Sequence, residues 1–236
     1  MSGHNKWSKI HRQKGVADNK RGALFTKLGK AITIAARTGG GQPVANFRLQ
    51  LAIDQARANN MPKDNIERAI KRGTGELEGG TIETVTYEGF GPGGVAFIIE
   101  CLTDNRHRTA ADIKHILTQH GGSFGGPNSV AWMFNLKGVV HTGVINADVE
   151  LALIDAGATD IAPEDNGSMV LCDPASLKAI TDVLQKNNLP VDYAQTEYLA
   201  KEKKPVDAAT KEQLEKMFDD LDNNEDVDNF YTDAQI

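Results

Sequence analysis

The sequence predicts an α+β protein in which an N-terminal three-helix domain is followed by two ferredoxin-like α/β domains, one inserted in the other. Helical periodicity dominates the first 73 residues, apolar strands begin near residue 82, and a β-α-β-β-α-β order starts at residue 138. Of the 236 residues, 40% are hydrophobic and 25% are charged. These proportions are ordinary for a soluble folded protein, and a chain of this length can bury a sizeable core.

The N-terminal domain is expected to open with a basic arm, residues 1–22, which shows no apolar period. Residues 23–37 follow as a helix, because apolar residues that include Leu28 and Ile32 recur on one face. Three consecutive glycines at 39–41 then end this helix.

Two further helices complete the predicted bundle. Residues 44–59 carry apolar side chains in two adjacent rows. Pro62 suits the first turn of the third helix, which has acids early and Lys71 and Arg72 late, with Gly73 as its expected C-cap. Three helices of this length form a small antiparallel bundle.

The pattern then changes from helical to extended. Ile82–Glu88 and Val95–Leu102 are expected to pair as a hairpin around the glycine-rich loop at 89–94. Thr109–Gln119 follows as a helix and Val130–Phe134 as a strand. Compared with a ferredoxin-like sandwich, which has four strands and two helices, this unit is short of one helix and one strand.

The next unit has a complete set of elements. In order, they are the strand Gly138–Thr142, the helix Asp148–Ala156, the strands Asp160–Pro163 and Ser168–Asp173, the helix Pro174–Asn187 and the strand Ala194–Lys201. This order is the split β-α-β, ferredoxin-like pattern.

The C-terminal segment supplies what the middle unit lacks. After a linker at 201–205, Thr210–Leu221 reads as an amphipathic helix and Val227–Tyr231 as a short strand. The expected domains are therefore residues 1–77, a discontinuous domain of 78–136 plus 205–236, and an inserted domain of 137–204.

Charge is strongly segregated along the chain. Met1 to Arg72 holds fifteen Lys and Arg and four acids, a net charge of +11. The remainder of the chain holds eleven Lys and Arg and 28 acids, a net charge of −17. Such asymmetry predicts a polyanion partner for the basic part. The last twenty residues contain seven acids and no base, and we expect this acidic segment to restrict non-specific polyanion binding.

Cations spaced along the arm and the first helix suit contact with successive phosphates, and an interleaved Trp or His suits stacking on an unpaired base. The expected nucleic-acid-binding residues are Lys6, Trp7, Lys9, His11, Arg12, Lys14, Lys20, Arg21, Lys27, Lys30 and Arg37. Lys27, Lys30 and Arg37 lie off the apolar stripe and are expected to face solvent or a ligand. Arg106 and Arg108, at the start of a helix, form a possible secondary phosphate site.

Other chemistries find little support. The sequence has no Walker A, Cys-x-x-Cys, His-Glu-x-x-His or Gly-x-Ser-x-Gly motif, so we expect no enzymatic activity, no metal and no cofactor. An enzyme that holds a nucleotide in the glycine loops at 89–94 and 121–127 is the alternative from another class. Cys101 and Cys172 lie in apolar runs and are expected to be buried, reduced thiols.

The location of the protein is also constrained by its sequence. No apolar run approaches the length of a membrane span, and the polar, basic N-terminus has no apolar segment typical of a secretory signal. We therefore expect a cytoplasmic protein with no membrane partner, and a monomer is favoured.

Several long motifs resemble those of the YebC family. They are MSGHNKWSKIHRQKGVADNKRGALFTKLGKAI, NMPKDNIERAIKRGTG, YEGFGPGGVAFIIECLTDNRHRTAADIKHI, GGSFGGPNSVAWMF and EDVDNFYTD. The resemblance covers essentially the whole chain; the only difference from the pattern is His107, where many relatives have Asn or another residue. It implies a non-enzymatic cytoplasmic protein with a helical N-terminal domain and two α/β domains. The family is described as probable transcriptional regulators that bind DNA, with a mitochondrial translational activator of cytochrome c oxidase and factors linked to stalled ribosomes among its relatives.

These observations favour a nucleic-acid-binding regulatory protein, a transcriptional regulator that binds DNA through its basic N-terminal domain. The alternative is a ribosome-associated translation factor that contacts ribosomal RNA through the same segment. The predicted bundle has no clear recognition helix with base-reading residues, and contacts to backbone and shape suit either nucleic acid.

Overall fold

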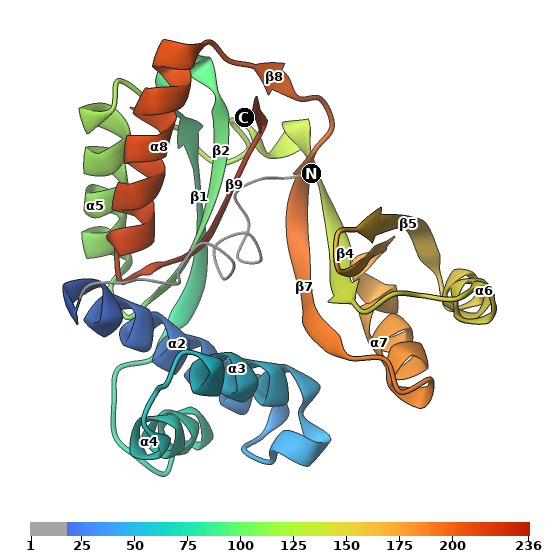
Figure 1. Cartoon of the computed structure of the whole chain (residues 1–236). Helices are drawn as coiled ribbons and strands as arrows, with labels where there is room; N and C mark the ends of the chain where they lie inside the picture. The colour runs from blue at the N-terminus through green and yellow to red at the C-terminus, as the bar shows by residue number, and fades with distance from the viewer. Residues whose placement is uncertain (1–17) are drawn as a thin grey trace. The chain divides into compact units, whose positions relative to one another are not determined.

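The computed structural model describes residues 18–236 and forms two compact units (Figure 1). The described residues as far as Ala131, together with Lys203–Ile236, form the first unit, and Trp132–Glu202 forms the second. A helical region is followed by two four-stranded antiparallel sheets with helices, so the α+β class predicted from the sequence is confirmed. No helix among the described residues is long and apolar enough to cross a membrane.

Three helices open the first unit. They are α2 (Asp18–Gly39), α3 (Phe47–Ala58) and α4 (Lys63–Thr74), with a 3₁₀ turn (Pro43–Ala45) before α3. Leu28 and Ile32 of the predicted stripe are buried, and they pack with Leu49, Ile53 and Ile66 from the other two helices. The helical periodicity of the sequence therefore identified the inward face of α2, and one of the two apolar rows expected for the second helix is the buried face of α3.

Gly73 has a different role from the one predicted. It lies inside α4, and the left-handed residue that ends the helix is Gly75, with φ 82°. A Cβ on Gly73 would lie 2.4 Å from the carbonyl oxygen of Thr33 and 2.7 Å from the Cβ of Ala36. Gly73 is thus required for the close crossing of α2 and α4, a contact between distant segments that helix-end rules cannot anticipate.

The remainder of the first unit is a sheet with two helices. Its elements are β1 (Glu83–Phe90), β2 (Ala96–Thr103), α5 (Arg106–Gln119), β3 (Ser123–Phe124), α8 (Ala208–Asn223) and β9 (Val227–Thr232), with the short strands β8 (Lys204–Pro205) and β10 (Ala234–Gln235) paired beside them. The strand order is β3-β1-β2-β9, and all neighbours are antiparallel. Figure 1 shows α5 and α8 side by side along this sheet.

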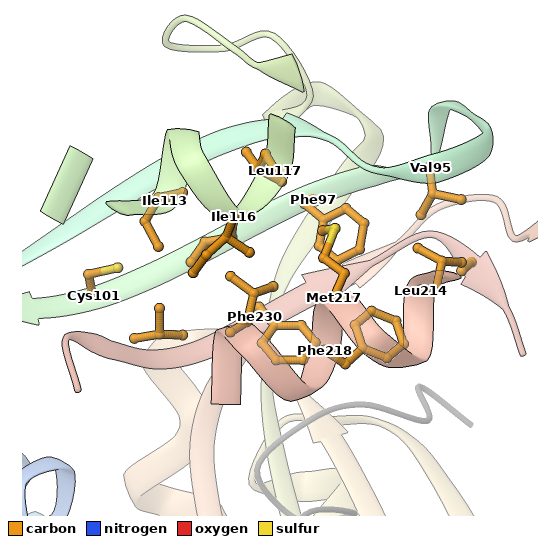
Figure 2. Packing of buried hydrophobic residues seen from close by; sticks show 14 residues of the cluster. Val95, Phe97, Cys101, Ile113, Ile116, Leu117, Leu214, Met217, Phe218 and Phe230 are labelled. Carbon is orange, nitrogen blue, oxygen red and sulfur yellow. The ribbon is translucent and has the colours of Figure 1, made fainter. Parts of the chain in front are cut away.

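The core of the first unit joins residues from both of its chain segments. Figure 2 shows Phe97 of β2 and Phe230 of β9 facing Met217 and Phe218 of α8. The ring centroids of Phe218 and Phe230 are 5.2 Å apart in a stacked arrangement. Cys101 is a free thiol in the same core, and burial raises its pKa. Because α8 and β9 supply so much of this buried surface, the C-terminal segment is an integral part of the sheet and helix layers.

The structure corrects one predicted strand. Residues 130–134 do not form a separate strand: Ala131–Met133 is a 3₁₀ turn, and Phe134–Thr142 is the single strand β4 of the second unit. The third strand of the first sheet is β3, two residues that pair with Gly89 and Phe90. A two-residue strand has no periodicity, so only its pairing with β1 could reveal it.

The second unit has the ferredoxin-like topology that its element order predicted. It contains β4, α6 (Ala147–Asp155), β5 (Ala158–Glu164), β6 (Gly167–Cys172), α7 (Leu177–Lys186) and β7 (Val191–Ala200). The antiparallel strand order is β5-β6-β4-β7. This order places the first and third strands at the centre, as in the split β-α-β pattern.

We predict that Gly73→Ala lowers the free energy of unfolding by about 2 kcal/mol, because the added methyl group meets the backbone of α2. Urea unfolding followed by circular dichroism measures this change. Gly22→Ala is the matched control, because Gly22 is an exposed residue of α2 with no atom within 4 Å of an added Cβ. This substitution should raise the free energy of unfolding by up to about 1 kcal/mol, since Ala favours a helix more than Gly does. Equal effects of the two substitutions would contradict the packing role of Gly73.

Candidate nucleic-acid interface

The expected nucleic-acid-binding residues divide into those the structure describes and those it does not. Lys6, Trp7, Lys9, His11, Arg12 and Lys14 lie outside the described residues, and only the backbone of Lys20 is described, in the first turn of α2. Arg21 and Arg37 are exposed residues of α2. Lys27 and Lys30 are half-buried.

Lys27 and Lys30 bind the C-terminal segment of the same chain. The Nζ atom of Lys27 donates to the carbonyl oxygen of Asp222 at 2.6 Å. The Nζ atom of Lys30 donates to the carbonyl oxygen of Glu225 at 3.0 Å and to Oδ1 of Asp226 at 2.5 Å. Both lysines therefore join α2 to the end of α8 and the turn that leads into β9.

Asp226 collects donors from a third element, the start of α5. Its carboxylate accepts hydrogen bonds from the guanidinium of Arg108, with the shorter distance 2.9 Å, and from the hydroxyl of Thr109 at 2.7 Å. The Asp226 side chain is only 6% exposed. One buried carboxylate thus ties together α2, α5 and the α8–β9 turn.

The electrostatics of Asp226 follow from these contacts. Burial by itself raises the pKa of a carboxyl group, but hydrogen bonds from Lys30, Thr109 and Arg108 outweigh it and hold the pKa of Asp226 below its usual value. The ionised form is therefore the one that the fold stabilises.

Arg106 has a carboxylate partner of its own. Its guanidinium donates to Glu83 of β1, and this hydrogen bond is the largest of the influences that lower the pKa of Glu83. Arg37 of α2 acts on the same carboxylate through its charge. Arg106 and Arg108, the possible secondary phosphate site, are thus both engaged in ion pairs with carboxylates.

A group of exposed cations lies where α2 and α4 end, and we call it the basic end: Arg37, Arg68, Lys71 and Arg72. Arg68, Lys71 and Arg72 have helical spacing on the face of α4 opposite its buried residues. The crossing at Gly73 brings the backbone nitrogen of Arg37 next to this part of α4. None of the four forms an ion pair within the described part of the chain, whereas Arg57 and Lys63 of the same bundle have acidic neighbours.

The exposed side chains of α4 suit phosphate binding. Arg and Lys donate charge-assisted hydrogen bonds to phosphate oxygens. No exposed Asn or Gln, the residues that read adenine, lies on α4. The basic end can therefore hold a nucleic-acid backbone, and guanine is the base whose edge suits its Arg and Lys side chains. The sequence signalled Lys71 and Arg72 only as helix-ending cations, because their proximity to Arg37 depends on the helix crossing.

The two glycine-rich loops are brought together by the pairing of β1 with β3. A Cβ on Gly122 would lie 2.1 Å from the carbonyl oxygen of Phe90, and one on Gly89 would lie 2.6 Å from that of Ser123. Close backbone packing therefore accounts for glycine at both positions.

Glu88, which sequence patterns did not single out, anchors the second of these loops. Its carboxylate accepts backbone hydrogen bonds from Asn128 and Val130 at 2.7 Å and from Ala131 at 2.8 Å. No three potential metal ligands come together among residues 18–236.

The acidic C-terminal segment is folded into the first unit. Asp220 pairs with Nε2 of His120 at 2.7 Å, and Asp222 and Asp226 bind the lysines of α2. Asp219 is exposed on the last part of α8. The segment therefore contacts the basic domain through defined side chains and backbone oxygens at its own helix end.

Comparison with known proteins gives consistent matches over the whole chain. A family model described as the TACO1/YebC protein N-terminal domain matches residues 5–76, and one described as the TACO1/YebC second and third domain matches residues 82–234. Probable transcriptional regulatory proteins of Geobacter sulfurreducens and Chlorobaculum tepidum are 46% and 48% identical over 241 and 240 residues, covering 100% of this chain and 96% of each relative. The crystal structure of a conserved hypothetical protein from Aquifex aeolicus matches with a TM-score of 0.83 and 36% identity, covering 98% of this chain and 96% of that one.

We predict that Asp226→Asn lowers the free energy of unfolding at neutral pH by about 3 kcal/mol, because Lys30 and Arg108 lose their buried counter-charge. Chemical denaturation measures the change. The matched control is Asp219→Asn, since Asp219 is exposed and has no ion pair among the described residues; its effect should stay within about 0.5 kcal/mol.

The same pair of proteins makes a pH test. Because the folded-state pKa of Asp226 is lowered, its stabilisation is fully present above the unfolded-state pKa of about 3.9 and is lost as the pH falls from there through the folded-state value. The stability difference between wild type and Asp226→Asn should therefore shrink below a pH of about 4. A difference that is constant with pH would contradict an ionised Asp226 in the folded protein.

Proposed function

The chain belongs to the TACO1/YebC family, and we propose that it is a regulatory protein that binds DNA through its basic N-terminal domain. The names of the curated relatives support a role in regulation. The nucleic-acid contact itself is inferred from the charge and exposure of the N-terminal residues.

The observation that carries the proposal is the exposed positive charge of the basic end. Eleven Lys and Arg against four acids lie in the three helices α2 to α4. The four cations of the basic end are exposed and have no ion-pair partner within residues 18–236. Such a surface attracts a polyanion and releases its condensed counterions on binding.

The ion pairs within the first unit narrow the set of expected contacts. Lys30 and Arg108 would each have to give up a buried carboxylate to reach a phosphate, so we assign them a structural role. The arm residues named above, Arg21 and the basic end are the proposed contacts. The proposed interface therefore has two parts: the basic end, where α2 and α4 end, and Arg21 with the arm, at the start of α2.

Phosphate contacts of this kind do not distinguish duplex DNA from structured RNA. The proposal therefore requires a direct comparison of a DNA duplex with structured ribosomal RNA of matched length at physiological salt. Tighter binding to DNA, with specific promoter footprints, supports the proposal. Co-sedimentation with ribosomes that is lost on removal of residues 1–22 would instead favour a translation factor.

We predict that replacing Arg68, Lys71 and Arg72 together with Ala makes the negative slope of log K against log salt shallower by up to about 3 units, if each contacts one phosphate of a duplex. Fluorescence anisotropy with a labelled duplex at several salt concentrations measures the slope. The matched control replaces Lys114, Lys186 and Lys211, which are also exposed and without an ion pair among the described residues. Equal losses in both triple variants would show that total charge, rather than the basic end, governs binding.

A second set of variants tests the arm. Replacing Lys9, Arg12, Lys14 and Lys20 with Ala should make the same negative slope shallower by up to about 4 units, because four phosphate contacts are removed. The thermal unfolding temperature should be measured in parallel to confirm that the variant is folded. An unchanged slope would move the interface away from the arm.

A further inference from the structure

Helix α6 of the second unit carries apolar side chains on both of its faces. Val149 and Leu153 point inward and are buried, at 5% and 0% exposure. Leu151 and Ile154, on the opposite face, are 63% and 52% exposed, and Val144 in the loop before the helix is 75% exposed. The outward face of a surface helix normally carries polar or charged side chains instead.

Carboxylates flank this outward apolar face. Asp148 and Asp155 lie on one side of Leu151 at helical spacing, and Glu150 lies on the other. All three are exposed, and none forms an ion pair with a cation of residues 18–236. Exposed apolar surface with a polar rim of this kind is characteristic of an interaction site.

The stability of the helix explains only part of this rim. Asp148 and Glu150 lie in the first turn, where the helix dipole favours negative charge. Asp155 is the last residue of α6, where the same dipole disfavours a carboxylate. Asp155 therefore adds acidity at a position where α6 itself gains nothing from it.

We propose that the outward face of α6, formed by Leu151 and Ile154, binds a basic segment of another protein. The segment would place two or three apolar side chains on Leu151 and Ile154 and Lys or Arg side chains opposite the three carboxylates. The whole second unit supports this polarity, because it holds four Lys and Arg against eleven acids, a net −7. Such a field steers a positively charged partner to the surface.

The same rim disfavours other occupants. A second copy of the chain that used this face symmetrically would bring its own three carboxylates against these three. An anionic lipid surface would be repelled for the same reason. The proposed surface belongs to the second unit and uses none of the residues proposed to contact nucleic acid.

Two synthetic helical peptides test the proposal with the full-length protein. Both carry the same leucines along one face; in one the flanking residues are Lys, and in the other they are Glu. Fluorescence anisotropy should detect binding of the Lys peptide only. The double variant Leu151→Gln, Ile154→Gln should weaken that binding at least about tenfold, because the apolar anchors are lost.

The rim is tested by the triple variant Asp148→Asn, Glu150→Gln, Asp155→Asn, which should also weaken the Lys peptide and flatten its salt dependence. The matched control neutralises three other exposed carboxylates of the second unit, Asp160, Asp165 and Asp192, and should leave the affinity within about twofold. Circular dichroism melts of each variant monitor folding. Binding of the Lys peptide that is insensitive to the α6 variants, or equal binding of both peptides, would overturn the proposal.

The excluded occupants have tests of their own. Sedimentation equilibrium should give the same association state for the full-length wild type and for the Leu151→Gln, Ile154→Gln variant. Vesicles of phosphatidylcholine with phosphatidylserine should not retain the protein through these residues. A dimer or a vesicle interaction that requires Leu151 and Ile154 would contradict the choice of a basic protein segment.

Discussion

The buried carboxylate of Asp226 is the constraint on which the arrangement of the first unit depends. It lies in the turn between α8 and β9, yet its donors come from Lys30 of α2 and from Arg108 and Thr109 of α5. A carboxylate with so little exposure is costly to bury unless it is paired and fully hydrogen-bonded. Because those donors come from elements far apart in sequence, satisfying Asp226 also fixes where the helical bundle meets the sheet.

This constraint also divides the cations of the N-terminal domain into two groups. Lys30 neutralises the Asp226 carboxylate and Lys27 binds the backbone carbonyl of Asp222, so both lysines hold the acidic C-terminal segment within the molecule. The basic end retains its charge at the surface. The strong charge asymmetry of the chain therefore has two physical uses, an internal one that joins the ends of the first unit and the proposed external one toward a polyanion.

Local regularities of the sequence predicted much of the fold. The helical periods, the β1–β2 hairpin and the order of the second unit all followed from apolar spacing and turn residues, which act within a few residues of one another. Contacts between distant residues could not be predicted in this way. The Lys30–Asp226 pair spans 196 residues, the Glu88 anchor reaches some forty residues along the chain, and the role of Gly73 depends on a helix crossing. The candidate interface shows the same limit, since its composition was evident from charge but the separation of structural from exposed cations required the fold.

The most direct measurement of the central claim is ultraviolet crosslinking of the full-length protein in cells, with sequencing of the recovered nucleic acid and mapping of the crosslinked peptides. Binding through the N-terminal domain predicts abundant crosslinks within residues 1–77, and a regulator of transcription predicts that the recovered nucleic acid is DNA from defined sites. Recovery of ribosomal RNA crosslinked to the same residues would support the N-terminal interface but show that its target is ribosomal RNA instead of DNA. The absence of crosslinked nucleic acid, or crosslinks confined to the acidic second unit, would contradict the account.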